Sequence, residues 1–134
     1  DLSPRWLGKQ EMFAGPLRPL FRALGGIPVD RENPGSLVAD IAAHAGAATA
    51  LALVVPAEGT RARGDHWKSG FYRVALAAGV PLGLAFIDYP RREVGILGWL
   101  ALTGNEAEDL AQLRALYAGK RGRIAENAGE IRFR

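Results

Sequence analysis

The sequence predicts an α/β fold in which a mostly parallel sheet is flanked by helices. Residues 50–55 form a continuous apolar run, which is typical of a strand covered on both faces. Residues 81–87 form a second run of this kind and are expected to be the next buried strand. Segments with apolar residues at helical spacing alternate with these strands, and this alternation predicts a parallel α/β layer.

The first part of the chain predicts two short strands and two helices. Residues 5–8 read as a short strand, and residues 17–24 read as a helix that a glycine pair ends. Residues 27–29 are expected to form another short strand. Residues 36–45 then predict a helix that begins with a serine N-cap.

The second part of the chain continues the alternation. Residues 71–78 predict a helix, and residues 92–99 predict a strand whose two leading arginines indicate a sheet edge. Thr103 and Glu106 have the spacing of a capping box, so an amphipathic helix is expected to run from there to Tyr117.

Length and composition indicate a single domain, residues 1–134, with a core of ordinary size. The chain has no cysteine and only two histidines, which excludes disulfides and thiolate metal sites. We expect no metal site and no bound cofactor.

The formal net charge of +3 favours an anionic ligand or an anionic membrane surface. The long basic tract of a non-specific nucleic-acid binder is missing, so no nucleic-acid partner is expected.

Neither a membrane span nor a signal peptide is evident in the sequence. The longest uncharged stretch, residues 41–57, is shorter than the roughly 20 apolar residues that a span needs. The chain starts at Asp1 rather than at methionine, and we expect further sequence before Asp1.

A polar loop follows the predicted strand at residues 50–55. It reads Glu58-Gly59-Thr60-Arg61, and Arg63, Lys68 and Arg73 follow within a short distance. Gly59 lets the backbone approach an anion or take a positive φ, Thr60 offers a hydroxyl, and Arg61 can make a bidentate contact with phosphate. The same string also fits a strand-to-helix turn with a local Glu–Arg pair, and the residues alone leave both interpretations open.

A second arginine follows another predicted strand end, in Gly25-Gly26-Ile27-Pro28-Val29-Asp30-Arg31. Ligands of parallel sheets collect at the carboxyl ends of strands, so Arg31 and Arg61 are expected to converge on one phosphate-sized anion. The alternative for Arg31 is an ordinary surface turn. We interpret His44 and His66 as non-catalytic, because neither has an acid five residues further on.

Four segments, in order, resemble the 1-acyl-glycerol-3-phosphate acyltransferases, the glycerolipid acyltransferases. They are listed in chain order: Leu7-Gly8-Lys9-Gln10-Glu11-Met12-Phe13 with Gly15-Pro16-Leu17, Gly25 to Arg31, Glu58 to Arg61 running into Lys68-Ser69-Gly70-Phe71-Tyr72, and Gly79-Val80-Pro81-Leu82 leading to Ile87-Asp88-Tyr89. The resemblance implies transfer of a fatty acyl group from acyl-CoA or acyl carrier protein to a hydroxyl of a glycerol-phosphate lipid, in phospholipid biosynthesis. It also implies a bacterial protein that lies peripherally on the cytoplasmic side of the cell membrane.

The resemblance assigns roles residue by residue. Lys9, Arg31, Gly59, Thr60 and Arg61 are implied to bind the substrate phosphate. Glu58 is the one candidate catalytic residue within the chain, and Pro81 matches a proline with an acyl-pocket or structural role. One departure is Pro56-Ala57 before Glu58, where the family has proline directly before the glutamate.

The family's catalytic base is a histidine in a His-x-x-x-x-Asp motif, and these 134 residues do not contain that motif. We expect it to precede Asp1, so the chain is expected to be N-terminally incomplete and inactive by itself. The alternative is a non-catalytic relative that binds phospholipid or phosphate. A third interpretation, an α/β protein that handles sugar phosphates, applies only if the resemblance misleads.

Overall fold

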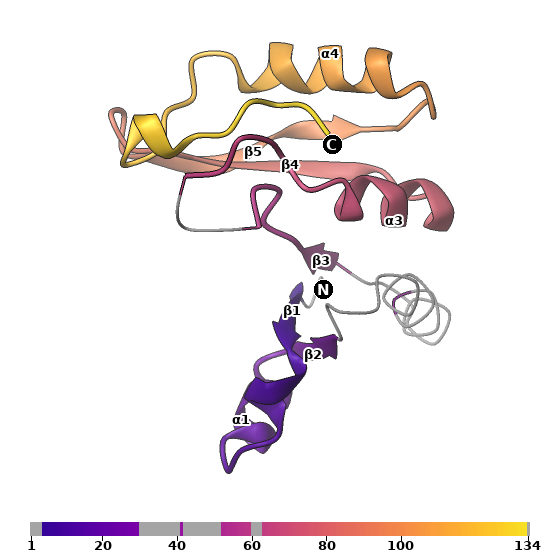
Figure 1. Ribbon diagram of the computed structural model, residues 1–134, viewed down its shortest axis with the longest axis vertical. Coiled ribbons are helices and arrows are strands. Elements are labelled where there is room, and N and C mark those ends of the chain that lie inside the picture. The colour runs from indigo at the N-terminus through magenta and orange to yellow at the C-terminus, as the bar shows by residue number, and fades with distance from the viewer. Residues whose placement is uncertain (1–3, 30–40, 42–51, 60–62, 134) are drawn as a thin grey trace. The chain divides into compact units, whose positions relative to one another are not determined.

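The computed structural model describes residues 4–29, 41, 52–59 and 63–133 (Figure 1). The chain divides into two compact units, Asp1–Val55 and Pro56–Arg134, and each has its own sheet. The expected helix at residues 36–45 lies outside the described residues except for Ile41, which is buried.

A three-stranded parallel sheet forms the centre of the first unit, in the order β2-β1-β3. Its strands are β1 (Pro4–Lys9), β2 (Gly26–Val29) and β3 (Ala52–Val54). Lys9 lies opposite Val29. Since all three strands run in one direction, their carboxyl ends lie at one edge of the sheet. The three strands confirm the parallel sheet predicted for this part of the chain. Val54 is 56% exposed, so the prediction that this strand is covered on both faces is wrong for its last residue.

Two short helices connect β1 to β2. They are η1 (Gln10–Phe13) and α1 (Arg18–Ala23), whose proline lies in the first turn where its missing N–H costs nothing. Four apolar residues occur at helical spacing in residues 17–24, and of these Phe21 is packed while Leu17, Leu20 and Leu24 are exposed.

An aromatic cluster and two glycines make the core of the first unit. The ring centroids of Trp6 and Phe13 are 5.9 Å apart, and Phe21 lies edge-on to both rings. A Cβ atom added to Gly8 would lie 2.7 Å from the Trp6 ring, and one added to Gly26 would lie 2.7 Å from the Phe13 ring. These glycines therefore let the aromatic side chains rest directly on β1 and β2.

The second unit is a β-hairpin between helices. Its elements are α3 (Gly70–Ala78), β4 (Leu82–Asp88), β5 (Glu93–Leu100), α4 (Glu106–Tyr117) and the short η2 (Ala125–Asn127). Figure 1 shows α4 running along the β4–β5 hairpin, and Leu84 and Leu100 pack there against Leu110 and Leu113. The helices and strands of this unit thus begin and end near the residues at which the sequence predicts them.

The pairing of β4 and β5 differs from the predicted mostly parallel sheet, because these two strands are antiparallel. Only four residues connect them, and a parallel pair needs a crossover of a dozen or more residues. The prediction of a buried strand at residues 81–87 is also wrong, because one side of β4 faces α4 while Ile87 on the other side is 62% exposed.

The cap of α4 differs from the prediction, and the end of the chain, for which no structure was predicted, packs on the second unit. The N-cap of α4 is Asn105, whose side chain accepts from the Glu108 N–H, and not Thr103. The basic tail leads into a segment that packs on the hairpin core through Ile131 and Phe133. Arg114 Nε donates to the Ile131 carbonyl at 2.8 Å, which ties this segment to α4.

Candidate functional site

The start of the polar loop is a tight turn from Pro56 to Gly59. The Gly59 N–H donates to the Pro56 carbonyl at 3.1 Å, and Gly59 has a φ of 67°, in the left-handed region that favours glycine. The Ala57 carbonyl accepts from the Lys68 N–H at 2.8 Å. The turn is therefore held from both its own backbone and the segment that leads into α3, with Glu58 half-buried at its tip.

Lys68 is the residue that the structure adds to this loop. A Cβ atom on Gly59 would lie 3.0 Å from Lys68 Cγ and 3.9 Å from Lys68 Cε, so the lysine stem lies over the glycine. In the sequence, Lys68 stands out as one of the basic residues near the loop and as part of the third family-like segment, without a role of its own. The available signal was its position two residues before α3, which begins at Gly70.

The other predicted phosphate-binding residues divide between described and undescribed parts of the chain. Lys9 is the last residue of β1, is exposed, and directly precedes η1. Arg31, Thr60 and Arg61 lie outside the described residues, so their convergence on one anion stays a prediction. Pro81 is exposed and separates the left-handed Gly79 at the end of α3 from the start of β4, and its acyl-pocket role is likewise untested.

The topology of the first unit gives the motif segments a common arrangement. Lys9 ends β1 and lies opposite Val29, which ends β2 two residues before Arg31. β3 runs parallel to β1 and ends at Val54, four residues before Glu58. Two motif segments of the first unit thus leave adjacent parallel strands at their carboxyl ends, and the polar loop, which belongs to the second unit, follows the third strand in the sequence.

His66 lies in a backbone-paired segment of the second unit. It forms an isolated β-bridge with Glu130, and the neighbouring Trp67 N–H donates to the Arg132 carbonyl at 3.0 Å. The half-buried His66 therefore belongs to a contact between the loop and the C-terminal segment. His44 lies outside the described residues.

A buried carboxylate, Asp109, joins α3 to the N-terminal end of α4. It accepts from the Tyr72 hydroxyl at 2.8 Å and from the N–H and hydroxyl of Thr103, each at 3.0 Å, and from the Gly104 N–H at 3.2 Å. Burial alone raises the pKa of Asp109, but these four donors together lower it below its ordinary value of 3.8. Burial first, and then the bond to Asp109, raises the pKa of Tyr72 to about 12. This fully bonded pair anchors α3, which follows the polar loop.

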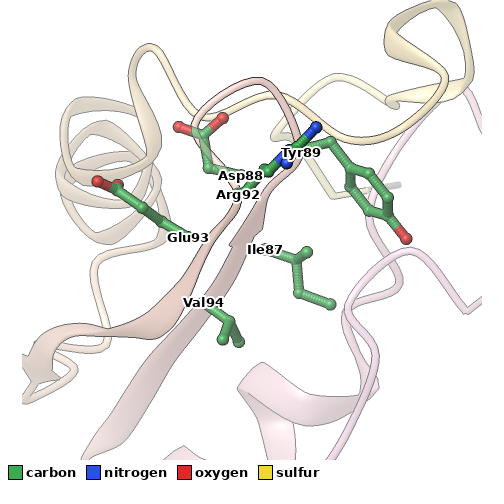
Figure 2. A pocket seen from close by; sticks show the side chains of 6 residues that line it. All are labelled: Ile87, Asp88, Tyr89, Arg92, Glu93 and Val94. Carbon is green, nitrogen blue, oxygen red and sulfur yellow. The ribbon is translucent and has the colours of Figure 1, made fainter.

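A shallow hollow of about 250 Å³ lies at the turn of the β4–β5 hairpin (Figure 2). In Figure 2, Ile87 and Val94 project to one side of the strands, and Asp88 and Glu93 project to the other. The buried Asp88 is paired with Arg91 at 3.0 Å, which makes it a structural charge pair of the turn. The hollow is therefore open and mostly apolar, and Tyr89, Arg92 and Glu93 also line it.

A metal cluster and a membrane-spanning helix are both absent from the part of the chain that the structure describes. Residues 4–29, 41, 52–59 and 63–133 contain no group of three or more His, Cys, Asp or Glu side chains that could hold a metal ion. Across the same residues, no helix has both the length and the apolar character that crossing a membrane requires.

Comparison with known proteins identifies the family. The family model described as "Acyltransferase" matches residues 2–83, which is more than half of the chain. The matched region contains Lys9, the segment through Arg31, the polar loop at 58–61 and Pro81. No curated protein and no solved structure matches the chain. As its resemblance to the glycerolipid acyltransferases predicted, the chain belongs to the acyltransferase family.

Proposed function

We propose that this chain carries the phosphate-binding part of an enzyme that moves a fatty acyl group from acyl-CoA or acyl carrier protein to a hydroxyl of a glycerol-phosphate lipid. The observation that carries the proposal is the placement of the motif segments. Lys9 ends β1, Arg31 follows β2, and the polar loop follows β3, and these three strands are adjacent and parallel. The carboxyl edge of a parallel sheet is where ligands of such folds bind.

The proposed phosphate ligands are Lys9, Arg31, Thr60 and Arg61. Guanidinium groups match phosphate in a planar, bidentate manner, while lysine acts as a point charge and threonine donates a neutral hydrogen bond. Gly59 supplies the left-handed turn that the loop needs. Glu58 is proposed to orient Arg61 or to accept from the substrate hydroxyl, and Pro81 to border the acyl chain or to stiffen the start of β4.

The proton of the acceptor hydroxyl must move to the leaving thiol during the transfer. The acceptor oxygen forms the ester bond with the acyl carbon, the C–S bond of the thioester breaks, and the hydroxyl proton ends on the released thiol. A base that removes this proton contributes roughly 10²–10⁴ in rate. We propose that the family's histidine supplies it from sequence before Asp1, and that the 134-residue chain therefore binds phosphate without transferring acyl groups.

The proposed location is the cytoplasmic surface of the cell membrane. The outer side of the β4–β5 hairpin supports this, because Val94 is 78% exposed and Trp99 is 66% exposed on the same face as Ile87. Arg91 and Arg92 lie exposed at the turn between the strands. Exposed apolar and aromatic side chains next to basic ones favour the interface of an anionic membrane.

The first experiment measures ligand binding to the 134-residue chain by NMR titration. Glycerol 3-phosphate should bind and glycerol should not, and Arg61→Ala should weaken binding of the phosphate by about ten- to a hundredfold. The matched control is Arg123→Ala, an exposed tail position outside the motifs. Equal affinity for glycerol and glycerol 3-phosphate would contradict the proposal.

A second experiment separates the enzyme from a binding module. The alternative is a relative that binds phospholipid or phosphate and transfers nothing. An acyl-thioester assay is run on the chain and on a protein that includes the sequence before Asp1. Turnover by the longer protein supports the enzyme, and phosphate binding without turnover by either protein supports the module.

A further inference from the structure

Arg92 has a backbone conformation that arginine rarely adopts. Its φ is 55°, in the left-handed region, and among the residues that the structure describes it is the one residue other than glycine with a positive φ. This conformation closes the turn of the β4–β5 hairpin, where the Arg92 N–H donates to the Tyr89 carbonyl at 3.2 Å. Glycine would adopt it at a lower conformational cost. A long charged side chain at a strained position points to a role for that side chain.

The Arg92 side chain lines the hollow of about 250 Å³ at this turn (Figure 2). Its neighbours around the hollow include exposed apolar and aromatic side chains. Ile87 is 62% exposed, Val94 is 78% exposed and Tyr89 is 51% exposed. The hollow therefore combines a cation with apolar surface that water now covers.

Both acids of the hollow are paired with other cations. Asp88 accepts from Arg91 at 3.0 Å and lies 3.9 Å from Lys120 Nζ. Glu93 lies 3.8 Å from the same Nζ. Within the part of the chain that the structure describes, Arg92 forms no ion pair. The charge of Arg92 is therefore available to a ligand, while the two acids are neutralised by their own partners.

Further positive charge lies beside the turn. The Tyr89 N–H donates to the Arg121 carbonyl at 3.0 Å, so the basic segment 120–123 passes next to the hairpin. Arg91, Arg121 and Arg123 are exposed. Cations thus outnumber acids around the hollow, and this excess complements a negatively charged partner.

We propose that the hollow at the hairpin turn binds the headgroup of an anionic phospholipid in the bilayer, with Arg92 as the cation that contacts it. The inference rests on the proposed membrane location and deepens it, because it names the lipid class and the residue that recognises it. Charge complementarity favours an anionic partner. The exposed Ile87, Val94 and Tyr89 favour a bilayer, since its interface accepts apolar and aromatic side chains next to basic ones.

The test measures cosedimentation of the 134-residue chain with phosphatidylcholine vesicles that contain or lack phosphatidylglycerol. Arg92→Gln should lower the partition coefficient into the anionic vesicles by about fivefold, and Arg92→Lys should retain most of the binding. The matched control is Arg73→Gln, which removes an exposed arginine of α3 outside the hollow. It should change the partition coefficient less than about twofold.

A glycine variant separates lipid recognition from folding. Arg92→Gly removes the cation and relieves the left-handed backbone, so it should leave Tm unchanged or raise it while it weakens binding to the anionic vesicles. Thermal unfolding monitored by circular dichroism measures Tm. A lower Tm for Arg92→Gly, or vesicle binding as tight as that of the parent chain, would overturn the proposal.

The remaining outcomes distinguish this inference from the proposed function. Equal losses for Arg92→Gln and Arg73→Gln would overturn the site, because net charge alone would then explain the binding. If Arg92→Gln weakens binding of acyl carrier protein and leaves vesicle binding unchanged, the partner is an acidic protein and the proposal is wrong. Absence of vesicle binding by a parent chain that still binds glycerol 3-phosphate would overturn this inference and the membrane location, but not the proposed acyl transfer.

Discussion

Asp109 is a carboxylate with no exposed surface, and within the described residues its charge is balanced by hydrogen bonds without an ion pair. Its donors come from α3, through Tyr72, and from the loop before α4, through Thr103 and Gly104. Removing the carboxylate would leave the buried Tyr72 hydroxyl unsatisfied, whereas Thr103 and Gly104 are exposed residues. An unsatisfied buried polar group costs about 1–3 kcal/mol, so the residue decides how firmly the two helices are joined.

We predict that Asp109→Ala lowers the free energy of unfolding by about 1–3 kcal/mol, because the buried Tyr72 hydroxyl loses its acceptor. The control is Glu108→Ala, the preceding exposed acid of the same helix turn, which should cost at most about 1 kcal/mol. Urea denaturation measures both changes. Equal small losses for the two variants would show that the buried carboxylate contributes little.

The Asp109–Tyr72 pair also predicts how stability depends on pH. The pKa of Asp109 is lowered in the folded state, so its contribution is present above the ordinary value of 3.8 and is lost as pH falls below it. The pKa of Tyr72 is raised to about 12, so its contribution is complete below the ordinary 10.0 and is lost as pH rises through about 12.

A spectroscopic titration tests the alkaline side. Tyrosinate absorbance should show an inflection near pH 12 that disappears in Tyr72→Phe. Burial also raises the pKa of Tyr117, so the difference between parent and variant, rather than the raw curve, identifies Tyr72. An unchanged curve in Tyr72→Phe would contradict the assignment.

At the scale of elements, Gly8 in β1 and Gly26 in β2 leave space for the aromatic side chains that pack on these strands. We predict that Gly26→Ala destabilises the first unit by about 1–3 kcal/mol, as expected for overpacking, because its Cβ would meet both the Phe13 ring and the Phe21 carbonyl. Gly15→Ala is the control, since a Cβ at Gly15 meets nothing within 4 Å. Hydrogen exchange of the β1 amides, together with urea unfolding, reports the difference, and equal protection in both variants would refute the packing argument.

The sequence predicts where helices and strands lie along the chain better than it predicts which strands pair and in which direction. Apolar runs placed β3, β4 and β5 within a few residues, because burial dictates side-chain pattern. The pattern of β4 does not reveal that its partner is antiparallel, and its outer side carries apolar residues that face outward. The tail segment that ends in Phe133 was missed for a related reason, since its few apolar residues lack a period.

The candidate site was predictable to a different extent. The sequence predicts that Lys9 lies at the end of a strand and that the polar loop follows a strand. In the structure Lys9 ends β1, and the polar loop follows β3 in the chain. Nothing in the sequence distinguishes Asp109 from the exposed acids beside it, because the sequence does not report burial. Lys68 could not be assigned to Gly59 because that contact depends on the fold of the intervening loop.

At the scale of the whole molecule, the exposed hairpin face predicts binding to anionic vesicles. Val94→Glu should lower the vesicle partition coefficient about tenfold, because it replaces an apolar group worth roughly 1.5 kcal/mol of burial with a charge. Ala107→Glu adds the same charge at an exposed position of α4 and should have little effect. Vesicle cosedimentation measures both variants, and equal losses would point to net charge rather than to the hairpin.

The central claim is that the enzyme recognises its acceptor through a phosphate at the polar loop. The most direct measurement is the ratio of kcat/KM for lysophosphatidate to that for monoacylglycerol, in a protein that includes the sequence before Asp1. We predict a preference of at least about tenfold for lysophosphatidate, which Arg61→Ala reduces towards one by lowering only the phosphorylated acceptor's kcat/KM. Equal use of both acceptors by the parent protein, or a preference that survives Arg61→Ala unchanged, would contradict the account.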